Sequence, residues 1–207
     1  RRNDPLTPEE LRSWKIALES KHKLLKQQGI SYLFIVVPDN QPIPKGYKRI
    51  PHHIIFDVKF DGRLKASLVA GGHRTPDVPK NESFSTVVSM EAVRLGCILL
   101  HMQCKFVCAG DVGNVYLYNK TREKAFIVAG LEFGPELEQK RLIVDKALYG
   151  LKISAARFHE HLSVKLRKMG FRPSKADTDL WIRKLQNGNY EYVARFVDDV
   201  IIFSTEP

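Results

Sequence analysis

The sequence has few cysteines and no long apolar run, and each absence excludes a class of protein. Cys97, Cys104 and Cys108 are the only cysteines among 207 residues, and no pair has CxxC spacing. They fit neither a disulfide framework nor a zinc site, and they indicate a reducing compartment. No apolar run reaches about 18 residues, so the sequence predicts no membrane span. No secretory signal opens the chain.

Acidic residues are scarce relative to basic ones. The chain has 33 Lys and Arg against 23 Asp and Glu, a formal net charge of +10. A basic surface concentrates polyanions, so nucleic acid is the leading partner and an anionic membrane the second. Charge alone leaves a merely solubilising role equally open. The hydrophobic content of 43% is typical of a globular protein. The chain begins with Arg1 instead of Met, and we expect it to be a piece of a longer protein.

The first half predicts a helix, a strand and a long hairpin. The helix runs from an N-cap at Thr7 to a stop at Gly29. A β-rich run covers 32–37, and alternating runs at 52–60 and 63–71 flank Asp61-Gly62, a strong hairpin signal. On the second arm, Lys65 lies on a cationic face opposite an apolar one. This face would suit a phosphate chain, although a solvated hairpin face is an equally good interpretation.

The second half predicts an α+β fold. We expect a loop over 73–88, a buried helix over 88–103 opened by Ser89, and a strand over 104–119 with Asp111 near its middle. Residues 120–140 are expected to be loop and 141–152 a strand and turn. An amphipathic helix follows from Ser154 to Gly170, and then strands around Asn187-Gly188. From residue 106 onward, this order predicts an antiparallel sheet with helices packed on one face.

Three aspartates stand out among the predicted strands. Asp111 lies in an apolar strand, and Asp198 and Asp199 lie between two apolar runs in YVARFVDDVIIFS. A carboxylate in such a setting is costly unless it is compensated, and neighbouring carboxylates repel by roughly 1–4 kcal/mol at about 4 Å. A divalent cation such as Mg²⁺ would relieve both penalties. The alternative is a salt-bridged strand acid and an ordinary Asp-Asp turn.

Five ordered blocks carry a family resemblance. They are KASLVAGG at 65–72, SFSTVVSMEAVR at 83–94, DVGNVY at 111–116, KALYGLKISAARFHEHL at 146–162 and FVDD at 196–199. Together they resemble the reverse transcriptases of copia-type (Pseudoviridae-like) LTR retrotransposons, over nearly the whole chain. The resemblance implies right-hand polymerase-like fingers and palm. Residues 1–104 would hold the N-terminal helix, the fingers-like hairpin and the first palm helix, and residues 105–207 the rest of the palm.

The resemblance implies a two-metal nucleotidyl transfer site. Asp111, Asp198 and Asp199 would be catalytic and would bind two Mg²⁺ ions, with Mn²⁺ as a substitute. The backbone at Val112 would contribute to the metal–triphosphate site. Tyr116 would lie under the incoming sugar and exclude a 2′-hydroxyl, although a tyrosine of the core is the alternative.

The remaining implied contacts bind the incoming nucleotide. Tyr149 and Gly150 match the turn that contacts nucleotide and template, and Lys152 and Lys65 are weaker members of the site. The cations that the family has at two positions are replaced by Ser67 and Gly71. Arg63 and Arg74 are candidates to replace them.

The implied function is RNA-directed DNA polymerase. Its partners would be an RNA template, a DNA or RNA primer, dNTPs and the rest of a Pol polyprotein, with no membrane. Thumb, connection and RNase H lie beyond the matched blocks, and integrase is a further expected part of the polyprotein. The expected location is a virus-like particle in the cytoplasm, with the nucleus second. The main alternative is a truncated, inactive nucleic-acid-binding remnant. A metal-dependent nuclease is third, because no extra acid or His stands ready as a general base for water.

Overall fold

A computed structural model describes residue 12 and residues 30–62, 64–75, 80–102, 106–113 and 115–205. The helix predicted from Thr7 to Gly29 lies outside these residues except for Arg12, which is helical. The chain divides into two compact units, residues 1–78 with 120–154 and residues 79–119 with 155–207. Each unit therefore combines two stretches that are distant in the sequence.

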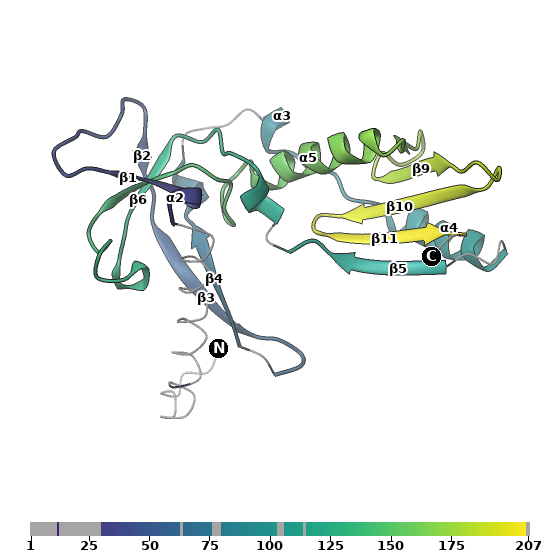
Figure 1. Ribbon diagram of the computed structural model, residues 1–207, viewed down its shortest axis with the longest axis horizontal. Coiled ribbons are helices and arrows are strands. Elements are labelled where there is room, and N and C mark those ends of the chain that lie inside the picture. The colour runs from purple at the N-terminus through teal and green to yellow at the C-terminus, as the bar shows by residue number, and fades with distance from the viewer. Residues whose placement is uncertain are drawn as a thin grey trace. The chain divides into compact units, whose positions relative to one another are not determined.

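The first unit contains a four-stranded sheet in the order β1-β7-β6-β2 (Figure 1). Its strands are β1 (Phe34–Val37), β7 (Arg141–Val144), β6 (Ala125–Val128) and β2 (Lys48–Arg49), and the short helix α2 (Ile30–Leu33) precedes β1. β7 pairs antiparallel with β1 and β6, whereas β2 pairs parallel with β6. The core of the unit is apolar and fully buried; it includes Leu33, Phe34, Ile50, Ile127, Phe133 and Leu142.

The expectation of a loop over 120–140 is wrong. The segment contains β6 and the 3₁₀ turn η3 (Leu131–Phe133). In β6, buried and half-buried residues alternate, but the strand has only four residues. Four residues put two side chains on each face, which is too short a pattern to stand out from polar flanks.

The hairpin predicted around Asp61-Gly62 is confirmed. It consists of β3 (His52–Val58) and β4 (Leu64–Ala70), which pair in register, and Gly62 has a φ of +81°. Along β4, every second residue from Ala66 to Ala70 is buried, as the alternation predicted. At the base of the hairpin, His52 pairs with Glu132, and β4 leads into the 3₁₀ turn η1 (Gly72–Arg74).

The second unit contains a five-stranded antiparallel sheet in the order β5-β11-β10-β9-β8. The strands are β5 (Phe106–Asp111), β11 (Asp199–Ser204), β10 (Tyr190–Phe196), β9 (Leu180–Lys184) and β8 (Arg172–Pro173). The hairpin around Asn187-Gly188 is confirmed, since β9 and β10 pair across it. The strand at 141–144, expected in this sheet, pairs within the first unit instead.

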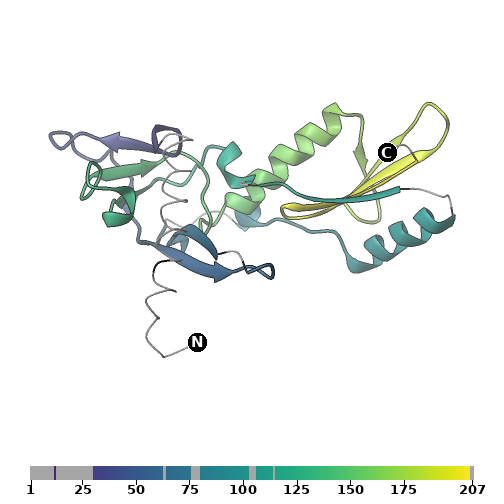
Figure 2. The ribbon, with the colours of Figure 1, turned by 60° about the horizontal axis from the view of Figure 1, so that its bottom comes forward.

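The helices do not share one face of this sheet, contrary to the prediction. Ala92 of α4 (Met90–Met102) packs on one side, and Leu166 of α5 (Ser154–Lys168) packs on the other (Figure 2). The first cluster includes Leu180, Ala194 and Phe203, and the second includes Trp181 and Val193. Successive strand residues point to opposite faces, and here both faces of β9 and β10 carry buried apolar side chains. Each face therefore needs its own helix.

The helices predicted over 88–103 and from Ser154 to Gly170 are confirmed as α4 and α5, but α4 is more exposed than predicted. Ser89 caps α4 by accepting the N–H of Ala92 at 3.2 Å, but the helix is not buried. Four of its large apolar residues are at least half exposed: Met90, Leu95, Ile98 and Met102. α5 ends at Lys168, and Gly170, two residues beyond it, has a φ of +86°. The short helix α3 (Lys80–Ser83) interrupts the loop expected over 73–88. No helix within the described residues is long and apolar enough to cross a bilayer.

Candidate functional site

The β10–β11 hairpin ends in a two-residue turn that holds Asp198 at its tip. Phe196 pairs with Asp199, so Val197 and Asp198 form the turn, and Val197 has a φ of +55°. A positive φ at the first turn position alone is the pattern of a type II′ turn. For a β-branched residue this conformation is an outlier that costs on the order of 1–3 kcal/mol. The turn therefore includes only one residue of the aspartate pair, and Asp199 is the first residue of β11.

The neighbouring strand places the third aspartate beside this tip. β5 pairs with β11 so that Asp111 lies directly opposite Asp199. The N–H of Val112 donates to the carbonyl oxygen of Asp198 at 2.9 Å. Like charges directly opposite each other on paired strands cost roughly 0.2–1 kcal/mol. The structure therefore gathers the three aspartates at one end of the sheet without a basic partner in the pairing.

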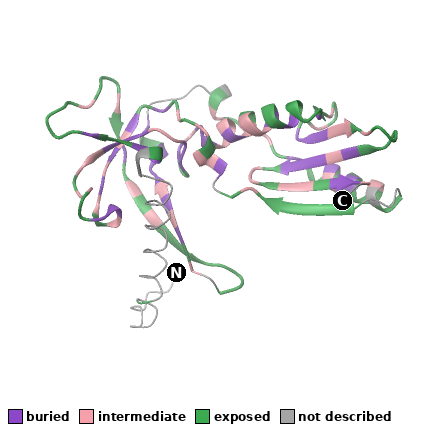
Figure 3. Ribbon diagram, viewed as in Figure 1, coloured by how far each residue is buried: buried purple, intermediate pink, exposed green. Residues whose placement is uncertain are grey.

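The environment of Asp111 differs from the sequence prediction. The strand ends at Asp111 instead of continuing to residue 119, and residues 115–118 form the 3₁₀ turn η2 (Val115–Tyr118). All six residues of β5 are exposed (Figure 3), because β5 is an edge strand. The argument from a carboxylate buried in an apolar strand is therefore wrong. The case for a cation depends instead on the crowding of like charges.

Tyr116 is influenced by the charge of Asp198. It is half-buried in η2. Burial, together with the negative charge of Asp198, raises the pKa of the Tyr116 phenol above its usual value. The phenol thus lies within electrostatic range of the hairpin tip, where a residue that contacts a bound sugar would have to be.

The donor chemistry fits a hard cation held by few protein ligands. Within the described residues, no three His, Cys, Asp or Glu side chains converge closely enough to hold an ion between them. Mg²⁺ keeps several water or phosphate ligands and is bound in polymerase-type sites through one or two carboxylates. The opposed pair Asp111 and Asp199, with Asp198 beside it, supplies ligands of that kind and number.

A second group of predicted residues lies in the first unit. The N–H of Ala70 donates to the carbonyl oxygen of Tyr149 at 2.8 Å, and Lys152 Nζ donates to the carbonyl oxygen of Thr75 at 3.2 Å. These bonds attach the turn at 149–152 to the end of β4 and to η1, which contains Arg74. Tyr149, Gly150, Lys152 and Arg74 are therefore neighbours.

Two glycines permit this close approach. Gly150 has a φ of +89°, and a Cβ there would lie 2.1 Å from the carbonyl oxygen of Ala70. A Cβ at Gly72 would lie 2.0 Å from the carbonyl oxygen of Gly150. No side chain fits at either position without moving backbone.

Lys65, the predicted cation of β4, is not part of this group. Lys65 is exposed and lies opposite Asp57, five residues before the end of β4, which is roughly 17 Å along the strand. At Gly71, where the family has Lys, a Cβ would lie 2.6 Å from Pro51. The tight contact with Pro51 therefore leaves no room for a lysine side chain at position 71 unless Pro51 moves. Arg63 lies outside the described residues.

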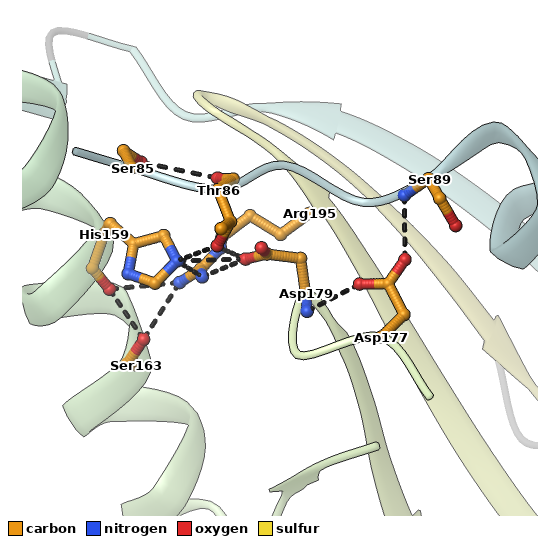
Figure 4. A network of polar contacts seen from close by, with 8 residues as sticks. All are labelled: Ser85, Thr86, Ser89, His159, Ser163, Asp177, Asp179 and Arg195. Carbon is orange, nitrogen blue, oxygen red and sulfur yellow. Dashed lines mark hydrogen bonds and ion pairs between the residues drawn. The ribbon is translucent and has the colours of Figure 1, made fainter. Parts of the chain in front are cut away.

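The sequence interpretation missed a buried polar network that supports the hairpin (Figure 4). Arg195 of β10 is 1% exposed and donates to Asp179, which is 0% exposed, through Nε at 2.9 Å and also through Nη2. Its Nη1 donates to the carbonyl oxygen of His159 and to Ser163 Oγ, both at 3.0 Å. The network joins β10 to α5 and to the residue before β9. A lone arginine in the apolar run YVARFV was the available signal.

His159 completes the network as a neutral acceptor. Its Nε2 lies 3.1 Å from Asp179 Oδ1 and 3.2 Å from Thr86 Oγ1, and it accepts from Arg195. Burial and then the charge of Arg195 lower the pKa of the His159 imidazole. A largely buried, neutral imidazole in contact with Arg195, Asp179 and Thr86 is consistent with structural support of the hairpin.

Comparison with known proteins identifies the family. The model of the family described as reverse transcriptase (RNA-dependent DNA polymerase) matches residues 37–207. The chain belongs to this family. The aspartates at the hairpin tip lie within the matched region, and the resemblance inferred from the sequence blocks is confirmed.

Its relatives are parts of transposon polyproteins. The chain is 29% identical over 154 residues to the Transposon Ty1-LR2 and Ty1-ML2 Gag-Pol polyproteins of Saccharomyces cerevisiae. It has the same identity to the Truncated transposon Ty1-A Gag-Pol polyprotein of that organism. The alignments cover 73% of this chain but only 8% of the first two relatives and 12% of the third. The chain thus corresponds to a small part of each polyprotein.

Proposed function

We propose that the chain is the fingers- and palm-like part of an RNA-directed DNA polymerase within a retrotransposon Pol polyprotein. It would act on an RNA template, a DNA or RNA primer and dNTPs, inside a cytoplasmic virus-like particle. The second unit would serve as palm and the first as fingers. The observation that carries the proposal is the pairing of Asp111 with Asp199 on neighbouring strands, with Asp198 in the adjoining turn.

The residues of the chain would share the reaction as follows. Asp111, Asp198 and Asp199 would hold Mg²⁺ against the substrate phosphates, and the rigid hairpin would fix their positions. Bound Mg²⁺ supplies Lewis-acid stabilisation of the attacking and leaving oxygens. Tyr116 would limit the space at the sugar.

The fingers-like group would position the nucleotide. Tyr149 and Gly150 present a close-packed backbone turn, and Arg74 lies beside it as an exposed cation. Lys152 is bonded to Thr75 and would hold this turn in place. Lys65 would reach the triphosphate from the hairpin.

Primer extension on an RNA template with Mg²⁺ tests the proposal. The parent polyprotein should extend the primer, and its Asp198→Asn form should lose about a hundredfold or more in rate, because a metal ligand supplies several kcal/mol of transition-state stabilisation. Asp57→Asn, an exposed acid on β3, is the matched control and should extend normally. The polymerase proposal fails if the parent polyprotein does not extend the primer, or if its Asp198→Asn form extends the primer at the same rate.

Two observations favour the second candidate, an inactive nucleic-acid-binding remnant. Ser67 and Gly71 replace cations, and no three acidic side chains among the described residues converge on one point. The same assay decides: template binding without extension, unaffected by Asp198→Asn, would support the remnant.

A further inference from the structure

Six exposed cations gather where the C-terminal end of α5 meets the β8 edge of the sheet in the second unit. We call them the β8-edge cluster: Lys165, Arg167, Lys168, Arg172, Lys175 and Lys184. The elements that carry them are in contact. The guanidinium of Arg167 lies 5.3 Å from the ring centre of Trp181 on β9, and Arg172 pairs with Ile182. Figure 1 shows the end of α5 beside β9.

Residues 162–190, all described, offer these cations only two carboxylates, of which one is half-exposed and one is buried. Their only acids are Asp177 and Asp179. Asp177 accepts the backbone N–H groups of Ser89 and Asp179 at 2.8 and 2.9 Å. Asp179 is buried against Arg195. The acid nearest in the sheet, Glu191, is buried in an ion pair with Arg183.

The helix dipole explains only half of the cluster. Lys165, Arg167 and Lys168 lie in the last turn of α5, where cations are favoured by roughly 0.3–1 kcal/mol. Arg172, Lys175 and Lys184 lie on strands or in a loop and have no such reason to gather. Repulsion among six like charges opposes the arrangement unless an anionic partner compensates it.

We propose that the β8-edge cluster binds the phosphate backbone of the primer–template duplex away from the reaction centre. The inference rests on the proposed function. Lys184 pairs with Tyr190 and Asp199 with Phe196, six residues apart along β10. For Lys184 that separation is roughly 20 Å, or about six base pairs at 3.4 Å each. Arg172 lies opposite Ile182, which pairs with Tyr192, four residues from Phe196 or roughly 14 Å along the strands. The end of the cluster that holds Lys184 and Arg172 would therefore contact duplex already formed and not the incoming nucleotide.

A nucleic-acid duplex fits the arrangement better than a small anion. The cations are dispersed over a helix end, an edge strand and a loop. A duplex carries one charge per about 1.7 Å of its axis and binds dispersed cations by releasing counterions. Binding through this cluster should therefore depend on duplex length and on salt.

Binding of hybrids with about 4 or about 20 base pairs tests the inference, at several salt concentrations and without dNTPs. In the 207-residue chain, the Arg172→Gln/Lys175→Gln/Lys184→Gln form should bind the long hybrid about tenfold or more weakly near 0.1 M salt. The slope of log affinity against log salt should fall by about 2–3. Binding of the short hybrid should not change.

Two control forms keep the result interpretable. Lys45→Gln/Lys48→Gln/Lys124→Gln removes equal charge from the first unit and should leave the ratio of long- to short-hybrid affinity unchanged. Arg172→Lys/Lys175→Arg/Lys184→Arg keeps the charge and should retain the wild-type ratio.

If the Arg172→Gln/Lys175→Gln/Lys184→Gln form keeps the wild-type ratio of long- to short-hybrid affinity, the inference is overturned. The same outcome is expected if an acidic protein, and not a duplex, occupies the cluster. The binding assay involves no nucleotide transfer, so its result can be interpreted even if the chain fails to extend a primer.

Discussion

Replacing Arg195 by Met should lower the free energy of unfolding of the second unit more than substitution of an exposed residue does. The change removes donors to Asp179, to His159 and to Ser163, and it leaves the Asp179 carboxylate at 0% exposure. One carboxylate oxygen of Asp179 already has no hydrogen-bond partner. Breaking a buried ion pair from one side costs about 3–5 kcal/mol. Proteins of this kind have only about 5–15 kcal/mol of stability, so the loss is a large fraction.

Urea denaturation followed by fluorescence measures this loss. Trp181 is 1% exposed and its ring lies 5.9 Å from the Arg195 guanidinium, so it reports on the region. A Trp14→Phe background leaves Trp181 as the single reporter, since the chain has 2 tryptophans.

The controls separate the buried pair from a general effect of the substitution. Arg172→Met, an exposed arginine of the same sheet, should cost less than about 0.5 kcal/mol. Adding Asp179→Asn to Arg195→Met removes the uncompensated charge and should recover part of the loss. The reasoning is refuted if Arg195→Met costs under about 1 kcal/mol, or if the double substitution is no more stable than the single one.

Three further predictions concern the turn, the pH dependence and the sugar site. Gly150→Ala should lower the free energy of unfolding more than Gly188→Ala does. At Gly188 φ is also near +87°, but no atom lies within 4 Å of the added Cβ, so Gly188→Ala should lower it by only about 1 kcal/mol. Equal losses in the two variants would contradict the steric argument. Burial and the Arg195 charge lower the pKa of His159 below 6.5, so on acidification the unfolded state binds the proton first. The free energy of unfolding should therefore fall as pH drops below about 6.5. His159→Gln should flatten this pH dependence, measured by denaturation between pH 5 and 8, and an unchanged slope would show that His159 does not cause it. Tyr116→Val should raise ribonucleotide incorporation in primer extension, whereas unchanged dNTP/NTP selectivity would make the tyrosine a core residue.

The sequence alone predicted the elements whose signals are local. The Asp61-Gly62 and Asn187-Gly188 turns depend on the conformational freedom of glycine, and Ser89 caps its helix through a neighbouring N–H. The aspartates at the hairpin tip were found through motif spacing, because FVDD lies between two apolar runs that pair with each other. These features require no knowledge of distant segments.

Pairing between distant segments could not be obtained in this way. The sequence placed residues 141–144 in the same sheet as Asp111, but the strand pairs with β1 of the first unit. β6 is four residues long and gives no usable periodicity. Apolar residues on both faces of β9 and β10 allow a helix on either side, so burial patterns did not decide where α4 and α5 pack.

The sequence by itself determined the residues of the candidate site: three carboxylates and a tyrosine in a basic chain, in motifs that resemble those of reverse transcriptases. Only the tertiary structure decided their surroundings. It made β5 an exposed edge, it set Asp111 opposite Asp199, and it buried Arg195 against Asp179 beneath the hairpin. Motif spacing is encoded along the chain, whereas exposure and charge pairing depend on which distant segments fold against each other.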